Sequence, residues 1–85
     1  MPYIRPGERI DIKGLTVDLG GKLETRKELC YVIATLMRVY VSDHGWNWSA
    51  MSDAIAAVEC AKLDFYAMVV QPYEEQRKKA NGDVP

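Results

Sequence analysis

The stretch Ser49–Gly82, SAMSDAIAAVECAKLDFYAMVVQPYEEQRKKANG, decides the fold, because it is a long helical pattern with apolar residues on two sides. At 100° per residue, one apolar face collects Met51, Ala54, Ile55, Val58, Ala61, Phe65, Met68 and Val69. A second apolar face collects Ala56, Cys60, Leu63, Ala67 and Val70. A helix that is apolar on two sides must be covered from two sides, so we expect it at the centre of a helical assembly.

A shorter amphipathic pattern precedes this stretch and predicts a helix over about residues 23–43. Its apolar face holds Leu29, Ile33, Leu36 and Tyr40, with Val32, Met37 and Val39 beside them. Thr25 is the expected N-cap, because Glu28 follows it at the spacing of a capping box.

A short connection follows this helix. Gly45 suits the left-handed position at a helix end, and Asn47 or Ser49 can cap the next helix. Because so short a loop favours antiparallel neighbours, we expect an all-α fold in which residues 23–43 and 49–71 form an antiparallel helical hairpin.

Pro72 divides the long stretch, because proline lacks the backbone N–H that a helix interior needs. The helix is expected to kink there or to restart as an extension over residues 72–81. A restart places Glu74 and Glu75 in a first turn, where the helix dipole favours anions, and basic residues near the end.

The first 22 residues contain two of the four prolines and four of the six glycines. These residues interrupt regular structure, although Ile10, Ile12, Leu15, Val17 and Leu19 are apolar and partly alternate with polar or small residues. We therefore expect residues 1–22 to be an irregular arm, with at most one helical turn, that lies over the helices.

The chain has 85 residues, which is enough for one small domain over residues 1–85 with a modest core. The two apolar faces of the long helix cannot both be covered by one other helix. We expect a second copy of the chain to cover the remainder, and a twofold-symmetric homodimer is the simplest homo-oligomer.

The charge balance excludes several kinds of partner. Eleven Lys and Arg residues against twelve Asp and Glu residues give a formal net charge of −1, so nucleic-acid binding is not expected. No apolar run is long enough for a membrane span or a signal peptide, so we expect no membrane contact and a cytoplasmic location. There, Cys30 and Cys60 are expected to be buried, reduced thiols rather than a disulfide.

Glu59 and Lys62 are polar residues set within the apolar part of the long helix. Lys62 lies near the centre of the main apolar face, and Glu59 three residues before it can reach it, with Tyr66 on the same flank. The favoured interpretation is structural: Lys62 extends to solvent and pairs with Glu59. The alternative is a site for a small anionic ligand.

Trp46 and Trp48 stand in the short loop between the two helices. Indole rings at such a place can stack on a ligand. We favour the other interpretation, that they plug the end of the helix pair or lie in an oligomer interface.

The motifs of several enzyme classes are missing from the sequence. It contains no phosphate-binding loop, no H-E-x-x-H and no pair of C-x-x-C motifs, and His44 is its one histidine. We therefore assign no catalytic residue, no metal ligand and no cofactor.

Three motifs occur in order along the second half of the chain: E-C-A-K-L-D-F-Y at residues 59–66, Q-P-Y-E-E at residues 71–75 and N-G-D-V at residues 81–84. From Leu29 onward the chain resembles a family of small, functionally uncharacterised proteins of bacteria and their phages, although the aromatic residue expected after N-G-D-V is absent. The resemblance implies an all-helical fold, and it marks Glu59, Lys62, Tyr66, Tyr73 and Asp83 as residues of interest without giving them roles.

Two functional hypotheses follow. The first is a non-enzymatic, oligomeric interaction or accessory protein of bacterial or phage origin that binds a larger protein partner, with the second apolar face and the tryptophan loop as its contact surfaces. The second is a small-ligand or nucleotide-binding protein that uses the cluster of Glu59, Lys62 and Tyr66, with Tyr73 as a further candidate binding residue.

Overall fold

The computed structural model describes residue 4 and residues 6–82, without the side chains of residues 6, 8 and 10. Four α-helices follow one another along this part of the chain, and no strand occurs in it: α1 (Pro6–Gly20), α2 (Arg26–Asp43), α3 (Trp48–Phe65) and α4 (Gln71–Asn81). A single π-helical turn, η1 (Tyr66–Val70), joins α3 to α4. The all-α prediction is therefore confirmed.

The irregular arm predicted for residues 1–22 is wrong, because residues 6–20 form helix α1. Proline is favourable at the first position of a helix, and Pro6 opens this one. Ile12, Leu15 and Leu19 have helical spacing on one face, and this spacing prevails over the strand-like alternation and over Gly14, which costs about 1 kcal/mol relative to alanine.

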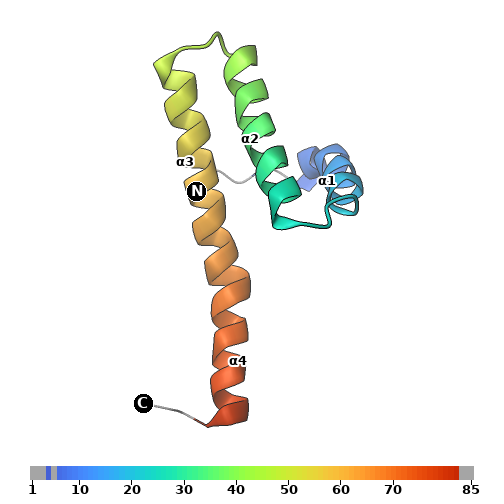
Figure 1. The fold of residues 1–85 in the computed structure, drawn as a ribbon, viewed down its shortest axis with the longest axis vertical. Coiled ribbons are helices and arrows are strands. Elements are labelled where there is room, and N and C mark those ends of the chain that lie inside the picture. The colour runs from blue at the N-terminus through green and yellow to red at the C-terminus, as the bar shows by residue number, and fades with distance from the viewer. Residues whose placement is uncertain (1–3, 5, 83–85) are drawn as a thin grey trace.

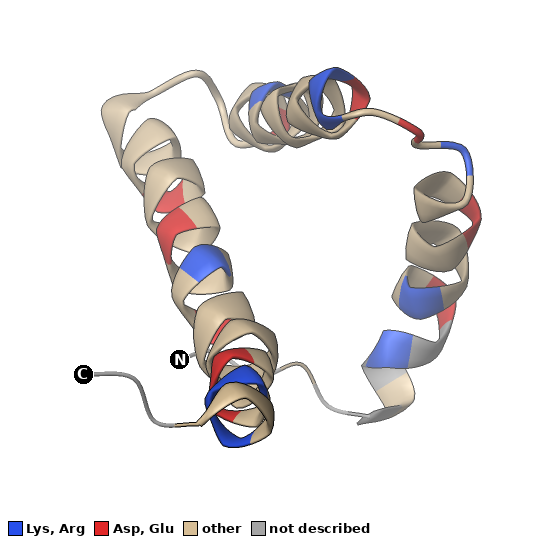
Figure 2. Ribbon diagram, turned by 60° about the horizontal axis from the view of Figure 1, so that its bottom comes forward, with Lys and Arg blue, Asp and Glu red and all other residues tan. Residues whose placement is uncertain are grey.

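The arm was also expected to lie over the other helices, and this too is wrong. Helix α1 stands beside the start of α2, away from the rest of the molecule, and contacts neither α2, α3 nor α4 (Figures 1 and 2). The described apolar side chains of α1 are consequently exposed, and Leu15 keeps 73% of its surface.

Helix α2 begins at the predicted capping box. The Glu28 backbone N–H donates to the Thr25 hydroxyl over 3.2 Å, and the Thr25 backbone N–H donates to Glu28 Oε1 over 2.9 Å. The Glu28 carboxylate also accepts from the backbone N–H of Glu24 and from the Thr25 hydroxyl, at 2.9 and 3.1 Å. These bonds fix the start of α2 at Arg26, three residues after the predicted position.

The connection between α2 and α3 has a left-handed backbone. Gly45 has φ of 95° and Trp46 has φ of 52°, so the chain reverses direction within a few residues. Asn47 then caps α3, because its side-chain oxygen accepts from the Ala50 backbone N–H at 2.8 Å. Asn47, rather than Ser49, is therefore the cap, and α3 starts one residue earlier than predicted.

Helices α2 and α3 run side by side from this loop, and they contact each other (Figure 1). The buried core of the described residues consists of Val41, Ala50 and Ala54, with Met37 and Met51 packed against it. This core lies next to the loop. Everything farther from the loop is half-buried or exposed.

The chain does not end or restart its helix at Pro72. Gln71 donates its backbone N–H to the carbonyl of Tyr66, five residues back, and α4 continues with helical backbone angles. A wider turn accommodates a residue that cannot donate to the carbonyl four residues earlier. Helices α3 and α4 with η1 therefore form one continuous helical rod, residues 48–81, hereafter the rod.

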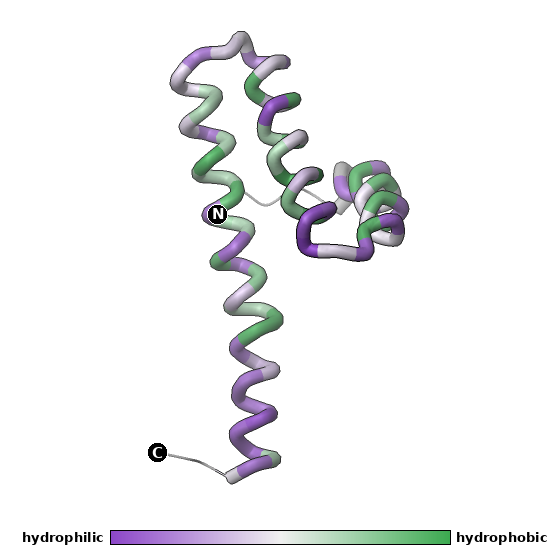
Figure 3. Tube along the Cα trace, viewed as in Figure 1, coloured by the Kyte–Doolittle hydropathy of each residue, from purple (hydrophilic) through white to green (hydrophobic). Residues whose placement is uncertain are grey.

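The last turns of the rod are hydrophilic, whereas its first half and α2 carry most of the apolar residues (Figure 3). In α4 the acidic residues Glu74 and Glu75 come first and three basic residues follow, and each of the helices carries residues of both signs (Figure 2). The molecule measures 52 × 30 × 28 Å, and its radius of gyration of 16.5 Å exceeds the roughly 12 Å of a compact chain of this length.

Candidate functional site

An open apolar groove lies between α2 and α3, beyond the small core. Its volume is about 690 Å³. Its walls are formed by Ile33, Leu36, Met37 and Tyr40 of α2 and by Asp53, Ala54, Ala57, Val58, Ala61, Lys62 and Phe65 of α3. These residues together are called the groove.

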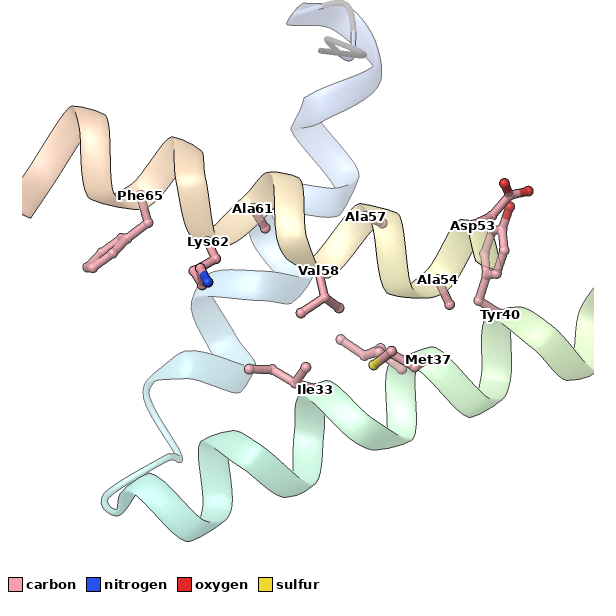
Figure 4. A pocket seen from close by; sticks show the side chains of 11 residues that line it. Ile33, Met37, Tyr40, Asp53, Ala54, Ala57, Val58, Ala61, Lys62 and Phe65 are labelled. Carbon is pink, nitrogen blue, oxygen red and sulfur yellow. The ribbon is translucent and has the colours of Figure 1, made fainter. Parts of the chain in front are cut away.

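The shape of the groove follows from its residue types. Helix α2 contributes large side chains at positions i, i+3, i+4 and i+7, whereas four of the seven lining residues of α3 are small, three alanines and one valine. Figure 4 shows Ile33 and Met37 directed toward Val58 and Ala54, with Lys62 and Phe65 farther along α3. Small residues on one wall leave space that no side chain of the described residues fills.

The predicted contact between Glu59 and Lys62 is confirmed. Lys62 Nζ lies 3.1 Å from Glu59 Oε1, and the two side chains are 70% and 60% exposed, respectively. The favoured structural interpretation, an extended lysine paired with its neighbour, describes this geometry. The pair is solvated, so it carries no buried charge.

Tyr66 and Tyr73 make separate contacts farther along the rod. The Tyr66 hydroxyl donates to Glu74 Oε1 over 3.3 Å, across the π turn. The Tyr73 hydroxyl accepts from Arg77 Nη1 at 3.3 Å, and the Arg77 guanidinium lies 6.0 Å from the Tyr73 ring centre. Neither tyrosine forms a hydrogen bond with Glu59 or Lys62, so the four candidate residues make three local pairs and no common site. The fifth marked residue, Asp83, lies outside the described residues.

The tryptophans and cysteines differ from the sequence-based expectations. Trp46 and Trp48 are 60% and 72% exposed, so they do not plug the end of the helix pair within one chain. Cys30 and Cys60 are free and exposed rather than buried. The physical reason is the same in both cases: two helices cover only one side of each other.

Sequence reasoning placed most groove residues of both helices on the docking faces, where close packing was expected, but not Asp53 or Ala57 of α3. The signal for a groove was present in Ala54, Ala57 and Ala61, because alanines facing Leu36 and Met37 cannot fill the space between two helices.

Residues 4 and 6–82 contain no group of three or more His, Cys, Asp or Glu placed to hold a metal ion. None of the helices in the same residues is long and apolar enough to cross a membrane.

A family model described as a domain of unknown function, DUF6899, matches residues 1–84. The match includes the first 28 residues, to which the resemblance noted in the sequence did not extend. No curated protein and no solved structure matches the chain. The function must therefore be argued from the exposed apolar surface itself.

Proposed function

Because this chain belongs to the DUF6899 family, whose function is unknown, it inherits no activity, and we propose that it is a non-enzymatic interaction protein that works as a homo-oligomer. A twofold-symmetric dimer is the simplest form. In it, the helical pair of α2 and α3 is the unit that packs against the second copy.

One observation carries this proposal, namely the exposed area of the single chain. Its accessible surface is 7768 Å². A compact monomer of 9.6 kDa exposes about 5,100 Å². The excess of about 2,700 Å² supports a partner, although α1 contributes part of it.

The composition of the exposed surface supports the same proposal. Only Val41, Ala50 and Ala54 are buried among the described residues, whereas Leu36, Ile55 and Phe65 each expose more than half of their surface. Apolar areas this extensive on a small chain are typical of interaction sites.

Sedimentation velocity of the full chain at micromolar concentration tests the proposal. We expect a species of at least twice 9.6 kDa. A monomer throughout the concentration range would refute the homo-oligomer.

We infer an accessory role beside a larger protein partner, in the cytoplasm of a bacterium or of a phage-infected cell. The free thiols of Cys30 and Cys60 support a reducing compartment, and the motif resemblance supports the origin. The formal net charge of −1 disfavours nucleic acid as the partner.

A second candidate function is the binding of a small anionic ligand, such as a nucleotide. Its support is the position of Lys62, which lines the groove and is the one cation among the residues that form it. A thermal-shift screen of wild type and Lys62→Met against nucleotides and other small anions tests it. Stabilisation of wild type alone would support ligand binding, and no shift in either protein would refute it.

A further inference from the structure

We propose that the rod of a second copy of this chain fills the groove, running antiparallel to the first rod, so that the bare half of each rod enters the groove of the other. This inference rests on the homo-oligomer proposed above and names the surface that forms it.

The first argument is that α2 accompanies only half of the rod. Helix α2 has 18 residues and spans about 27 Å, whereas the 34 residues of the rod span about 51 Å. Helix α2 contacts α3 and neither η1 nor α4 (Figure 1). Each chain therefore has one half of its rod that forms the groove and one half without a neighbour.

The unaccompanied half carries an apolar stripe, formed by Phe65, Val69 and Tyr73. These three side chains are 59%, 50% and 58% exposed. Phe65 belongs to both features, because it also lines the end of the groove (Figure 4). The groove and the stripe are thus continuous along one side of the rod.

The π turn keeps the stripe in line with the groove. At α-helical steps Ala54, Ala61 and Phe65 lie within about 40° of one another, but Tyr73 would lie about 80° away from Phe65. The π turn at residues 66–70 contains one extra residue, which sets every later side chain back by about 100°. Tyr73 then lies within about 20° of Phe65.

Twofold symmetry pairs the groove-forming half of each rod with the unaccompanied half of the other rod, which closes the assembly at two copies. The midpoint of residues 48–81 lies between Asp64 and Phe65. A dyad at this point, perpendicular to the rod, places each stripe against the partner's groove and repeats the contact twice. No open end is left for a third copy.

The area and the charge of the surface agree with a second copy. A permanent homodimer buries about 1,000–2,500 Å² per chain, and the exposed excess of about 2,700 Å², part of which belongs to α1, is large enough to supply such an interface. The groove lining contains one anion, Asp53, and one cation, Lys62. Charge therefore selects neither an acidic nor a basic partner, whereas the stripe offers the apolar side chains that the groove requires.

The test compares Phe65→Glu with Leu63→Glu in the full chain, by sedimentation over a concentration series. Both wild-type side chains are 59% exposed, and they lie two residues apart on the same helix, pointing in nearly opposite directions. We expect the dissociation constant to rise at least tenfold for Phe65→Glu and to change less than threefold for Leu63→Glu. An unchanged Phe65→Glu, or a larger effect of Leu63→Glu, would overturn the inference.

Disulfide trapping tests the register separately. With Cys30 and Cys60 replaced by serine, Phe65→Cys should form a covalent dimer on oxidation, since residue 65 lies beside the dyad. Ala57→Cys should not, whereas it would if the two groove faces met directly. A covalent dimer formed by Ala57→Cys but not by Phe65→Cys would overturn this arrangement. So would the absence of a covalent dimer in both variants, if the protein is otherwise oligomeric. A monomeric wild type would instead refute the proposed function.

Discussion

Glu28 shows how a solvated side chain stabilises the start of α2. Hydrogen bonds to its carboxylate hold the pKa of Glu28 below its ordinary range: the backbone N–H of Glu24 contributes most, followed by the Thr25 hydroxyl and the Thr25 backbone N–H. All three stabilise the charged form.

The lowered pKa makes this cap dependent on pH. The stabilisation is fully present above the unfolded pKa of about 4.3 and is lost as the pH falls through the lower folded value. We predict that Glu28→Gln melts at a lower temperature than wild type at pH 7 and that the difference narrows as the pH falls through the lowered pKa of Glu28, as followed by circular dichroism. Thr25→Ala, the comparison variant, should lose about 1 kcal/mol at pH 7 and keep part of this loss in acid, because the bond from the Glu28 backbone N–H to the Thr25 hydroxyl does not depend on the charge of Glu28. A difference for Glu28→Gln that persists in acid would contradict the assignment.

The Glu59–Lys62 ion pair is predicted to contribute little to stability. Exposed pairs on a helix contribute about 0.2–1 kcal/mol, because water solvates both charges. A double-mutant cycle with Glu59→Gln and Lys62→Met, analysed by urea unfolding, should give a coupling energy below about 1 kcal/mol. A larger coupling would mean that the pair is desolvated in the assembled protein.

At the scale of elements, the π turn is the feature that sequence reasoning did not predict. Pro72 identified the place where the helix is disturbed, but the choice between a kink, a restart and a wider turn depends on neighbouring carbonyl groups that no residue type reveals. The capping box at Thr25 and the cap at Asn47 were predictable, because they need only two side chains at a fixed spacing.

Replacing Pro72 tests the role of the π turn. In Pro72→Ala the backbone N–H is restored, so a regular α-helix can form and turn Tyr73 away from the groove side. We predict at least as much helix by circular dichroism, with a dissociation constant raised at least tenfold. Gln71→Ala, which keeps the proline, should associate like wild type. Equally tight association of both variants would show that the alignment is unimportant.

At the scale of the whole molecule, the chain lacks a core large enough for its length. Sequence analysis placed the apolar residues on helix faces correctly, including Ile33 and Tyr40 of α2 and Ala54 of α3. It could not show that so few of these residues become buried, because burial depends on the direction in which α1 leaves the other helices. Even the existence of α1 was not predicted, because its glycines and prolines are typical of irregular structure. The candidate residues Glu59 and Lys62 were recognised as a pair, but the groove beside them was not.

If a second copy of the chain buries the apolar residues that one chain leaves exposed, the thermal stability of the protein depends on its concentration. Because unfolding then includes dissociation, a tenfold increase in protein concentration should raise the melting temperature by about 3–6 °C. Circular dichroism at 5 and 50 µM measures this. Phe65→Glu is the matched variant and should show a smaller dependence. A wild-type melting temperature independent of concentration would indicate that each chain folds alone.

The exposed loop between α2 and α3 has an optical consequence. Trp46 and Trp48 are the only tryptophans in the chain, and both rings already face solvent, so the tryptophan fluorescence reports on this loop alone. Their emission changes little when the helices unfold, because water surrounds the rings before and after. The same emission would shift clearly if a larger protein covered the loop, so tryptophan fluorescence can test for the proposed partner without an added label.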